Sequence, residues 1–182
     1  MTSSAPGRKG KVFLTHGEKA SFSVEGDKLY VVEPAEKILL QTYDLRGQRL
    51  NKVELADIPK IKITPEDKLE LMAHFKYVNG LGNQRWQFFK KNFNFYHPEY
   101  FPRYQKTTID QQRLYMMTYE YKKDAVAFLI YDTKGNFKKK RLLPKSRVWA
   151  IKNNIYYYLI FSDDEEEWTL NKIILSACPQ KP

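Results

Sequence analysis

Short runs of apolar and polar residues, separated by turn-forming residues, cover most of the chain. The clearest pattern occurs twice: Tyr43-Asp44-Leu45-Arg46-Gly47-Gln48 has an echo in Tyr131-Asp132-Thr133-Lys134-Gly135-Asn136. An apolar-rich run, at 37–43 or 125–131, precedes each copy. The aspartate can accept an amide hydrogen bond from the residue two positions on, and the glycine supplies the positive φ of a tight turn. The repeat therefore predicts two β-hairpins.

A second pattern lies upstream of these hairpins and occurs three times, at 22–32, 107–117 and 148–158. Each copy has a short strand, a turn of small or polar residues, and a second strand that opens with an apolar residue and a tyrosine. The turns are Gly26-Asp27, Gln111-Gln112 and Asn153-Asn154. Glycine and asparagine suit the positive φ of such turns, whereas the glutamine pair is a poorer match.

Joined together, the two patterns predict units of four antiparallel strands and roughly 40 residues, which is typical of a β-propeller blade. We therefore expect an all-β fold: a partial β-propeller of about three four-stranded antiparallel blades with a helical inter-blade insertion. In the last blade, strands are expected at about 157–162 and 168–176, with the acidic run 163–167 in place of the Asp-x-basic-Gly turn. The expected segments are a flexible leader at 1–10 and a propeller-like domain at 11–178, with blades at 20–55, 104–143 and 147–176 and an insertion at 56–103. The short strand at 11–15 is expected to belong to a neighbouring, incomplete blade.

The insertion predicts a helix that begins after Thr64. Thr64 is a suitable N-cap, Pro65 fits the first helical position, and Asp67 stands where a capping box has glutamate. Gly80 and Gly82 are expected to end the helix. One face carries Leu69, Met72, Ala73 and Lys76, with Leu71 and Phe75 beside it.

Aromatic and basic residues alternate in the segment 83–97, which is the best candidate for a binding site. The candidate residues are Arg85, Trp86, Lys90, Lys91, Tyr96 and His97. Rings in this pattern could stack on bases or sugars while the charges meet phosphates. The alternative is that the aromatic residues, which include Phe88, Phe89, Phe93 and Phe95, pack the insertion against the rest of the fold. Phe89 is near helical spacing from Trp86 and Phe93, whereas Phe93-Asn94-Phe95 alternates like a strand, and we favour packing.

No other group of residues forms a catalytic or metal-binding pattern, and no cofactor is expected. His16, His74 and His97 lie in three separate elements without metal-ligand spacing, and Cys178 has no nearby histidine. The acidic run 163–167 lacks the alternation and the glycine of a calcium loop, so we expect an exposed hairpin tip. The net charge of +10 is compatible with an acidic partner, but charge on turns and edge strands also maintains solubility, and we favour the second explanation.

The segment Tyr96-His97-Pro98-Glu99-Tyr100-Phe101-Pro102, followed by Thr108-Ile109-Asp110 and Leu114-Tyr115, resembles the bacterial six-bladed β-propeller proteins of the NHL-like kind. In that family an inter-blade helix leads to a Phe-Pro segment, and then to a strand, a turn and a second strand. The hairpins at 43–47 and 131–135 look like the family's Asp-x-x-Gly turns. The resemblance covers about 20–176 and implies the fold, but the family has no single conserved activity to transfer. Because a closed six-bladed ring needs about twice this length, we expect the chain to be the C-terminal half of a longer protein or to assemble as two copies.

These observations predict a non-enzymatic binding or protein-interaction module on a β-propeller scaffold, with a protein partner or a second copy that completes the propeller. One alternative is a propeller-type hydrolase or lactonase with a metal at the axis. The equivalent positions Glu25, Asp110 and Lys152 do not match, which counts against a symmetric metal site. Another alternative is nucleic-acid binding through the basic aromatic insertion, whose affinity would fall steeply with salt. The chain as written has neither a signal peptide nor a membrane-spanning run, so a cytoplasmic protein is expected if it is complete and an exported one if a longer precursor exists.

Overall fold

The structure of the protein is a computed structural model that describes residues 11–14, 19–56, 58–78, 80–162 and 166–175. Strands make up 52% of the described residues and helices 15%, which confirms a fold built mainly of β-sheet. Two compact units are present, and we describe each by itself. The insertion unit consists of Met1–Gly17 and Lys60–Pro102, and the sheet unit consists of Glu18–Pro59 and Arg103–Pro182. The expected leader at 1–10, together with His16 and Cys178, lies outside the described residues.

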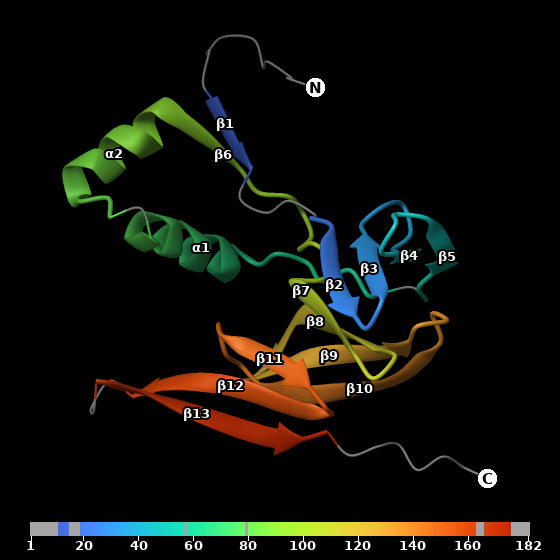
Figure 1. The fold of residues 1–182 in the computed structure, drawn as a ribbon. Coiled ribbons are helices and arrows are strands. Elements are labelled where there is room, and N and C mark those ends of the chain that lie inside the picture. Colours follow the sequence, from blue (N-terminus) through green and yellow to red (C-terminus); the bar gives the residue numbers. More distant parts are fainter. Residues whose placement is uncertain (1–10, 15–18, 57, 79, 163–165, 176–182) are drawn as a thin grey trace. The chain divides into compact units, whose positions relative to one another are not determined.

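Three antiparallel sheets follow one another along the sheet unit (Figure 1). The first sheet contains, in order, β2 (Ser21–Glu25), β3 (Lys28–Glu33), β4 (Leu39–Asp44) and β5 (Arg49–Glu54). The second contains β7 (Lys106–Asp110), β8 (Arg113–Lys122), β9 (Ala125–Asp132) and β10 (Phe137–Pro144). The third contains β11 (Trp149–Lys152), β12 (Ile155–Ser162) and β13 (Glu167–Ile174). Each strand pairs with its sequence neighbour, as the hairpin repeats predicted.

Over the residues that the structure describes, the third sheet has three strands, so the prediction of four strands in this segment was wrong. One continuous strand, β12, replaces the two strands that were expected between 155 and 162. The run Ile155-Tyr156-Tyr157-Tyr158-Leu159-Ile160-Phe161 contains no glycine, proline or asparagine, so nothing in it favours a turn. Its aromatic and β-branched residues favour an uninterrupted strand.

The structure also moves the alignment of the third repeat by one residue. When the two-residue turns are superposed, Arg113 corresponds to Ile155, and Leu114 therefore corresponds to Tyr156. The sequence pattern had matched Leu114 with Ile155. Because successive residues of a strand point to opposite faces, this single step exchanges the two faces of β12.

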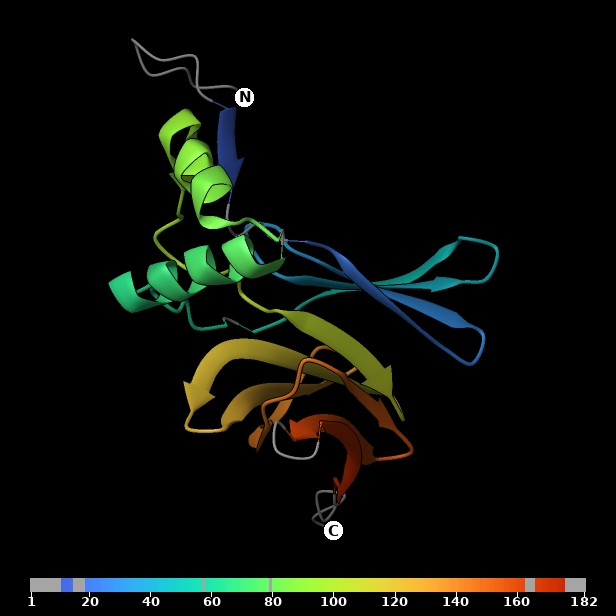
Figure 2. The same cartoon turned by 90° about the vertical axis from the view of Figure 1, so that its left-hand side faces the viewer.

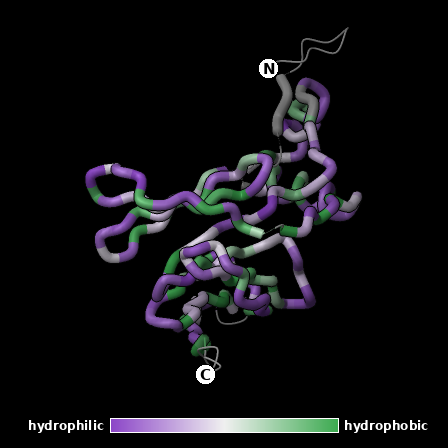
Figure 3. Tube along the Cα trace, turned by 90° about the vertical axis from the view of Figure 1, so that its right-hand side faces the viewer, coloured by the Kyte–Doolittle hydropathy of each residue, from purple (hydrophilic) through white to green (hydrophobic). Residues whose placement is uncertain are grey.

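Both Asp-x-basic-Gly hairpins have the predicted turn. Asp44 Oδ1 accepts the Arg46 amide at 2.9 Å, and Asp132 Oδ1 accepts the Lys134 amide at 2.9 Å. Gly47 has a φ of 80° and Gly135 a φ of 86°, which is the conformation that required glycine. Figure 3 shows that the hairpin tips of the first sheet are mostly hydrophilic, whereas hydrophobic residues lie further along its strands.

Two hydrophobic clusters join the three sheets, and the second sheet lies between the other two (Figure 2). One cluster joins the first and second sheets through Tyr30, Val32, Leu40, Leu114, Met116, Leu129 and Tyr131. The other joins the second and third sheets through Tyr115, Met117, Phe128, Trp149, Ile151 and Tyr156. The alternation along β8 sends Leu114 and Met116 to one cluster and Tyr115 and Met117 to the other. The middle of the second sheet, formed by the first half of β8 and by β9, is therefore buried on both faces.

The insertion unit contains α1 (Pro65–Val78) and α2 (Asn83–Asn92), with a parallel pair formed by β1 (Lys11–Leu14) and β6 (Phe93–Tyr96). The strand at β1 was expected to belong to an incomplete blade, and this prediction was wrong because β1 pairs with the insertion. The capping box is confirmed: Thr64 Oγ1 accepts the Asp67 amide at 3.2 Å, and the Asp67 carboxylate accepts the Thr64 amide at 2.8 Å. After α1, Gly80 has a φ of 58°, and its amide donates to the Tyr77 carbonyl, as in a glycine C-cap.

Candidate functional site

The aromatic residues of the insertion unit form a cluster centred on Phe75 of α1. The ring of Phe75 lies 6.3 Å from Trp86, 5.5 Å from Phe89 and 5.8 Å from Phe95, measured between ring centroids. Helix α2 supplies Trp86 and Phe89 from one face, at the helical spacing of three residues, and β6 supplies Phe95. These separations are typical of packed aromatic pairs.

This arrangement differs from the helix face expected on α1. Leu69, which was expected on that face, is 72% exposed. Phe75, which was expected next to the face, is the residue of α1 whose ring contacts the aromatic residues of α2 and β6. Apolar residues on α1 are not confined to one stripe, so their spacing alone could not identify the packed side. The packed side of α1 is the side whose residue Phe75 contacts the aromatic residues of α2 and β6.

The basic candidates on α2 remain exposed: Arg85, Lys90 and Lys91 all have accessible side chains. The Lys90 ammonium lies 5.7 Å from the centroid of the Trp86 ring, so these two candidates are brought together in a cation–π contact. Trp86 thus has its ring among protein partners, and this arrangement stabilises the local fold without any ligand.

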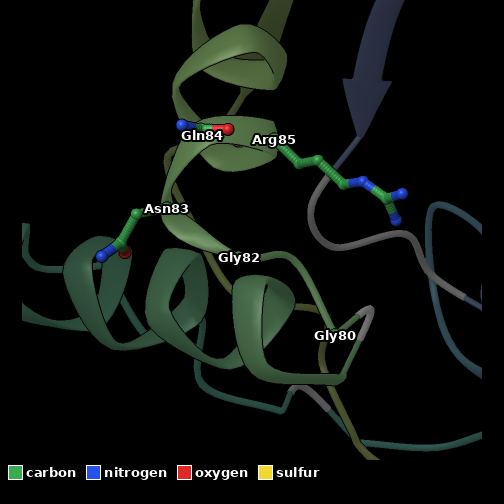
Figure 4. A pocket seen from close by; sticks show the side chains of 5 residues that line it. All are labelled: Gly80, Gly82, Asn83, Gln84 and Arg85. Carbon is green, nitrogen blue, oxygen red and sulfur yellow. The ribbon is translucent and has the colours of Figure 1, made fainter.

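A hollow of about 440 Å³ lies where α1 ends and α2 begins, lined by Gly80, Gly82, Asn83, Gln84 and Arg85. Figure 4 shows that the side chains of Asn83, Gln84 and Arg85 point in different directions. Asn83 Oδ1 already accepts a hydrogen bond from Lys76 Nζ at 2.6 Å. The polar groups therefore do not converge on one point, as a selective ligand site would require.

Tyr96 and His97 end the aromatic stretch. Tyr96 is exposed on β6, and His97 is half-buried just after it. Partial burial lowers the pKa of His97, and the positive charge of Lys68 lowers it further. At neutral pH the lowered pKa favours the uncharged imidazole, so His97 adds little to the positive charge of Arg85, Lys90 and Lys91.

Carboxylates at the ends of the first strands of two sheets bind the turns of the sheet that follows. Glu25, the last residue of β2, accepts the amides of Gln111 and Gln112 through its two carboxylate oxygens. Asp110, the last residue of β7, accepts the Asn153 amide at 2.9 Å and the Asn154 amide at 2.7 Å. We call these two contacts the turn clamps. The sequence comparison missed them, although an acid at the end of each of these strands was a visible signal.

The turn clamps also explain why acids occupy positions where an axial metal site was considered. Each carboxylate uses both oxygens on backbone amides of the next sheet, so neither is directed at a shared ion. Within the described part of the chain, no group of three histidine, cysteine, aspartate or glutamate side chains is placed to hold a metal. Asp163, Asp164 and Glu165 of the acidic run lie outside the described residues.

The first and third sheets each have one face that the described residues of the sheet unit leave uncovered. On the third sheet this outer face carries Phe161, Trp168, Leu170 and Ile174, and the last three are 60%, 65% and 71% exposed. On the first sheet the outer face carries Phe22, 76% exposed, and Val24, 62% exposed, with Leu29 and Val31 paired opposite them. Large exposed apolar side chains that gather on one face of a sheet are characteristic of interaction sites.

The fold and these surfaces define an all-β protein in which successive antiparallel sheets are joined by turn clamps and interrupted by a helical insertion. No protein-family model matches the sequence, and a search of curated proteins finds no match either. Neither of the two described helices is long and apolar enough to cross a membrane.

Proposed function

We propose that this chain is a non-enzymatic protein-interaction module built on a partial β-propeller scaffold, in which the outer face of an end sheet contacts a protein partner. The outer face of the third sheet carries the proposal. Phe161 and Trp168 pack on each other there, with ring centroids 5.1 Å apart, and both remain exposed. Tryptophan and phenylalanine are enriched at the centres of protein interfaces, and exposed pairs of this type provide anchors for a partner.

The organisation of the sheets supports the propeller scaffold. Each sheet is antiparallel and sequential, and the first strands of successive sheets are neighbours, β2 of β7 and β7 of β11, as in adjacent blades of a propeller. Successive sheets pack face to face through the two hydrophobic clusters. A stack of this kind leaves one open face at each end, which is where the exposed apolar residues lie.

A photo-crosslinking experiment tests the proposed function. The full chain would carry p-benzoylphenylalanine in place of Trp168, and a matched chain would carry it in place of Lys134, which is exposed at the β9–β10 turn. Irradiation in an extract of the cells that make the protein should give a discrete protein adduct from position 168 and none from position 134. Equal labelling from the two positions, or none from position 168, would contradict the proposal.

A second candidate is nucleic-acid binding by α2, which the exposure of Arg85, Lys90 and Lys91 favours. Fluorescence anisotropy with a labelled single strand would test it, with a Lys90→Ala/Lys91→Ala double variant for comparison. Phosphate contacts predict a log–log salt slope that becomes shallower by about 0.7 for each lysine removed. An affinity that is the same for both chains would exclude α2 as the binding surface.

A further inference from the structure

We propose that the partner on the outer faces is a second copy of this chain, arranged head to tail so that the third sheet of one copy packs on the first sheet of the other. This inference rests on the proposed function, since it names the partner of the same surface. Two such contacts would close a ring of six sheets from two chains. Three observations support this arrangement, and they concern the first sheet, the third sheet and the turn clamps.

The outer face of the first sheet has apolar residues at the positions where the second sheet packs against the sheet that precedes it. Leu114 and Met116 of β8 face the first sheet and are fully buried. Their equivalents in the first repeat are Leu29 and Val31, which lie on its outer face. Ile109 is likewise buried, and its equivalent is the exposed Val24. The first sheet therefore presents apolar side chains at the positions where the second sheet contacts its predecessor.

The outer face of the third sheet has apolar and aromatic residues at the positions where the second sheet contacts the sheet that follows it. Tyr115 and Met117 of β8 face the third sheet and are buried against it. Superposition of the turns makes Tyr157 and Leu159 of β12 their equivalents, on the same face as the exposed Phe161. This face could accept a further sheet as the second sheet accepts the third.

Charge complementarity at the turn clamp identifies the following sheet as the first sheet of another copy. Lys152 ends β11 at the position that Glu25 and Asp110 occupy in the other repeats, so it would lie at the β2–β3 turn of the incoming sheet. That turn is Gly26-Asp27, and it is the one of the three that contains a carboxylate. A lysine cannot accept amide hydrogen bonds, but it can pair with the aspartate. Lys152 and Asp27 are both exposed in the single chain.

The geometry of the junction explains why two copies would suffice. The junction is heterologous, because different surfaces of the two chains meet, and such junctions give rings when the rotation closes and filaments when it does not. Within each chain three sheets already follow one another through two junctions. A six-sheet ring is a common propeller size, and two chains of three sheets supply it with two identical junctions.

Solution mass, measured by size-exclusion chromatography with light scattering, tests the arrangement. We expect the full chain at micromolar concentration to have twice its mass of 21.6 kDa. Asp27→Lys would place two cations at each junction, and the dissociation constant should rise at least about tenfold. The double variant Asp27→Lys/Lys152→Glu restores opposite charges and should restore the dimer. Asp124→Lys, which makes the same charge change at the exposed β8–β9 turn, should leave the dimer intact.

Other results would overturn the inference. A folded monomer, or a dimer that Asp27→Lys does not weaken, would exclude this junction, and an open series of larger polymers would exclude the closed ring of two chains. Circular dichroism and a thermal melt establish that each variant is folded, and Leu170→Lys tests the same junction from the third sheet. An adduct from position 168 to a different protein would contradict the second copy while supporting the proposed function. Absence of any adduct would contradict the proposed function itself.

Discussion

The first and second sheets are copies of one repeat, and they differ most where a preceding sheet would touch them. In the second sheet, the Gln111-Gln112 turn is held by the Glu25 carboxylate, and Gly135 lies against Val53 of the first sheet. In the first sheet, the equivalent turn Gly26-Asp27 receives no carboxylate from the described residues, and a Cβ added at Gly47 would meet no described atom within 4 Å. The comparison shows that the residues at the turns of a sheet depend on whether another sheet packs against those turns, and not only on the fold of the sheet itself.

The turn residues illustrate this dependence. Gln111 and Gln112 have φ values of 50° and 57°, which are unfavourable for residues other than glycine, asparagine and aspartate. The turn without a clamp has glycine at its first position, whereas the two clamped turns contain none. The carboxylate supplies two charge-assisted hydrogen bonds that offset the strain of the left-handed conformation.

The largest effect should follow from removing the buried clamp. Asp110 is 2% exposed, and Asp110→Ala would leave the Asn153 and Asn154 amides without their acceptor. We expect the free energy of unfolding to fall by about 2–3 kcal/mol, measured by urea denaturation. Glu25→Ala removes the same type of clamp at a more exposed position, so a loss of about 1 kcal/mol is expected. Equal losses for the two variants would show that burial does not set the strength of the clamp.

The next largest effect should be a difference in stability between alanine variants of the two turn glycines, Gly47 and Gly135. An alanine at either position must adopt a positive φ, which costs about 1 kcal/mol. At Gly135 the new Cβ would also lie 3.1 Å from Val53 Cγ2 and 3.3 Å from the Glu54 carbonyl oxygen, whereas at Gly47 it meets open space. Gly135→Ala should therefore destabilise by about 2 kcal/mol and Gly47→Ala by about 1 kcal/mol. A Val53→Ala background should reduce the difference between them, and its persistence would argue against the contact.

Much of this architecture could be predicted from the sequence, because the repeat fixes both its turns and its strands. Asp44, Gly47 and their equivalents gave the hairpins, and Thr64 with Asp67 gave the start of α1. The repeat could not predict that the third sheet has three described strands. The tyrosine-rich run of β12 contains no turn-forming residue, and it therefore forms one long strand where the repeat has two. Nor could it give the partner of β1, because a four-residue strand carries too little pattern to choose between two edges.

The candidate site was harder to predict for a related reason. Trp86, Lys90 and Lys91 lie on one segment of the sequence, but the same composition fits a nucleic-acid surface and a packed cluster. The contacts of Phe75 with Trp86, Phe89 and Phe95 show that these rings pack on one another, and they join elements that are separate in the sequence. The turn clamps likewise join residues 86 and 43 positions apart. Local periodicity contains no information on such pairs.

The pH dependence of stability should distinguish the two aspartate turns. Asp44 and Asp132 accept equivalent amides, but Asp132 also pairs with Lys138 at 2.8 Å and accepts the Asn136 side chain. Burial opposes ionisation of Asp132, yet the hydrogen bonds from Lys138 and Asn136 outweigh it and lower its pKa to about 2. Because the pKa of Asp132 is lower in the folded chain, its ionised carboxylate stabilises the fold fully at pH values above the ordinary pKa of 3.8. This stabilisation is lost as the pH falls toward about 2.

Asp132→Asn should therefore reduce the free energy of unfolding by about 1 kcal/mol at pH 7, and the difference from the unmodified chain should shrink as the pH falls below 4. Urea titrations at several pH values would measure this. The Lys138→Met variant should show the same direction with a smaller effect, because the Asn136 hydrogen bonds remain. A pH-independent difference would show that the geometry of the turn, and not the charge of Asp132, is responsible.

The smallest effect concerns the strained turn itself. Gln112→Gly would relieve the positive φ at the second turn position, where glycine is the preferred residue of a two-residue hairpin, while the amide that Glu25 binds is retained. We expect a gain of about 0.5–1 kcal/mol in the free energy of unfolding. Gln112→Ala, which removes the side chain without that freedom, should give no gain. If the two variants behave alike, the conformation of residue 112 is not under strain, and the preference for glycine in the unclamped turn needs another cause.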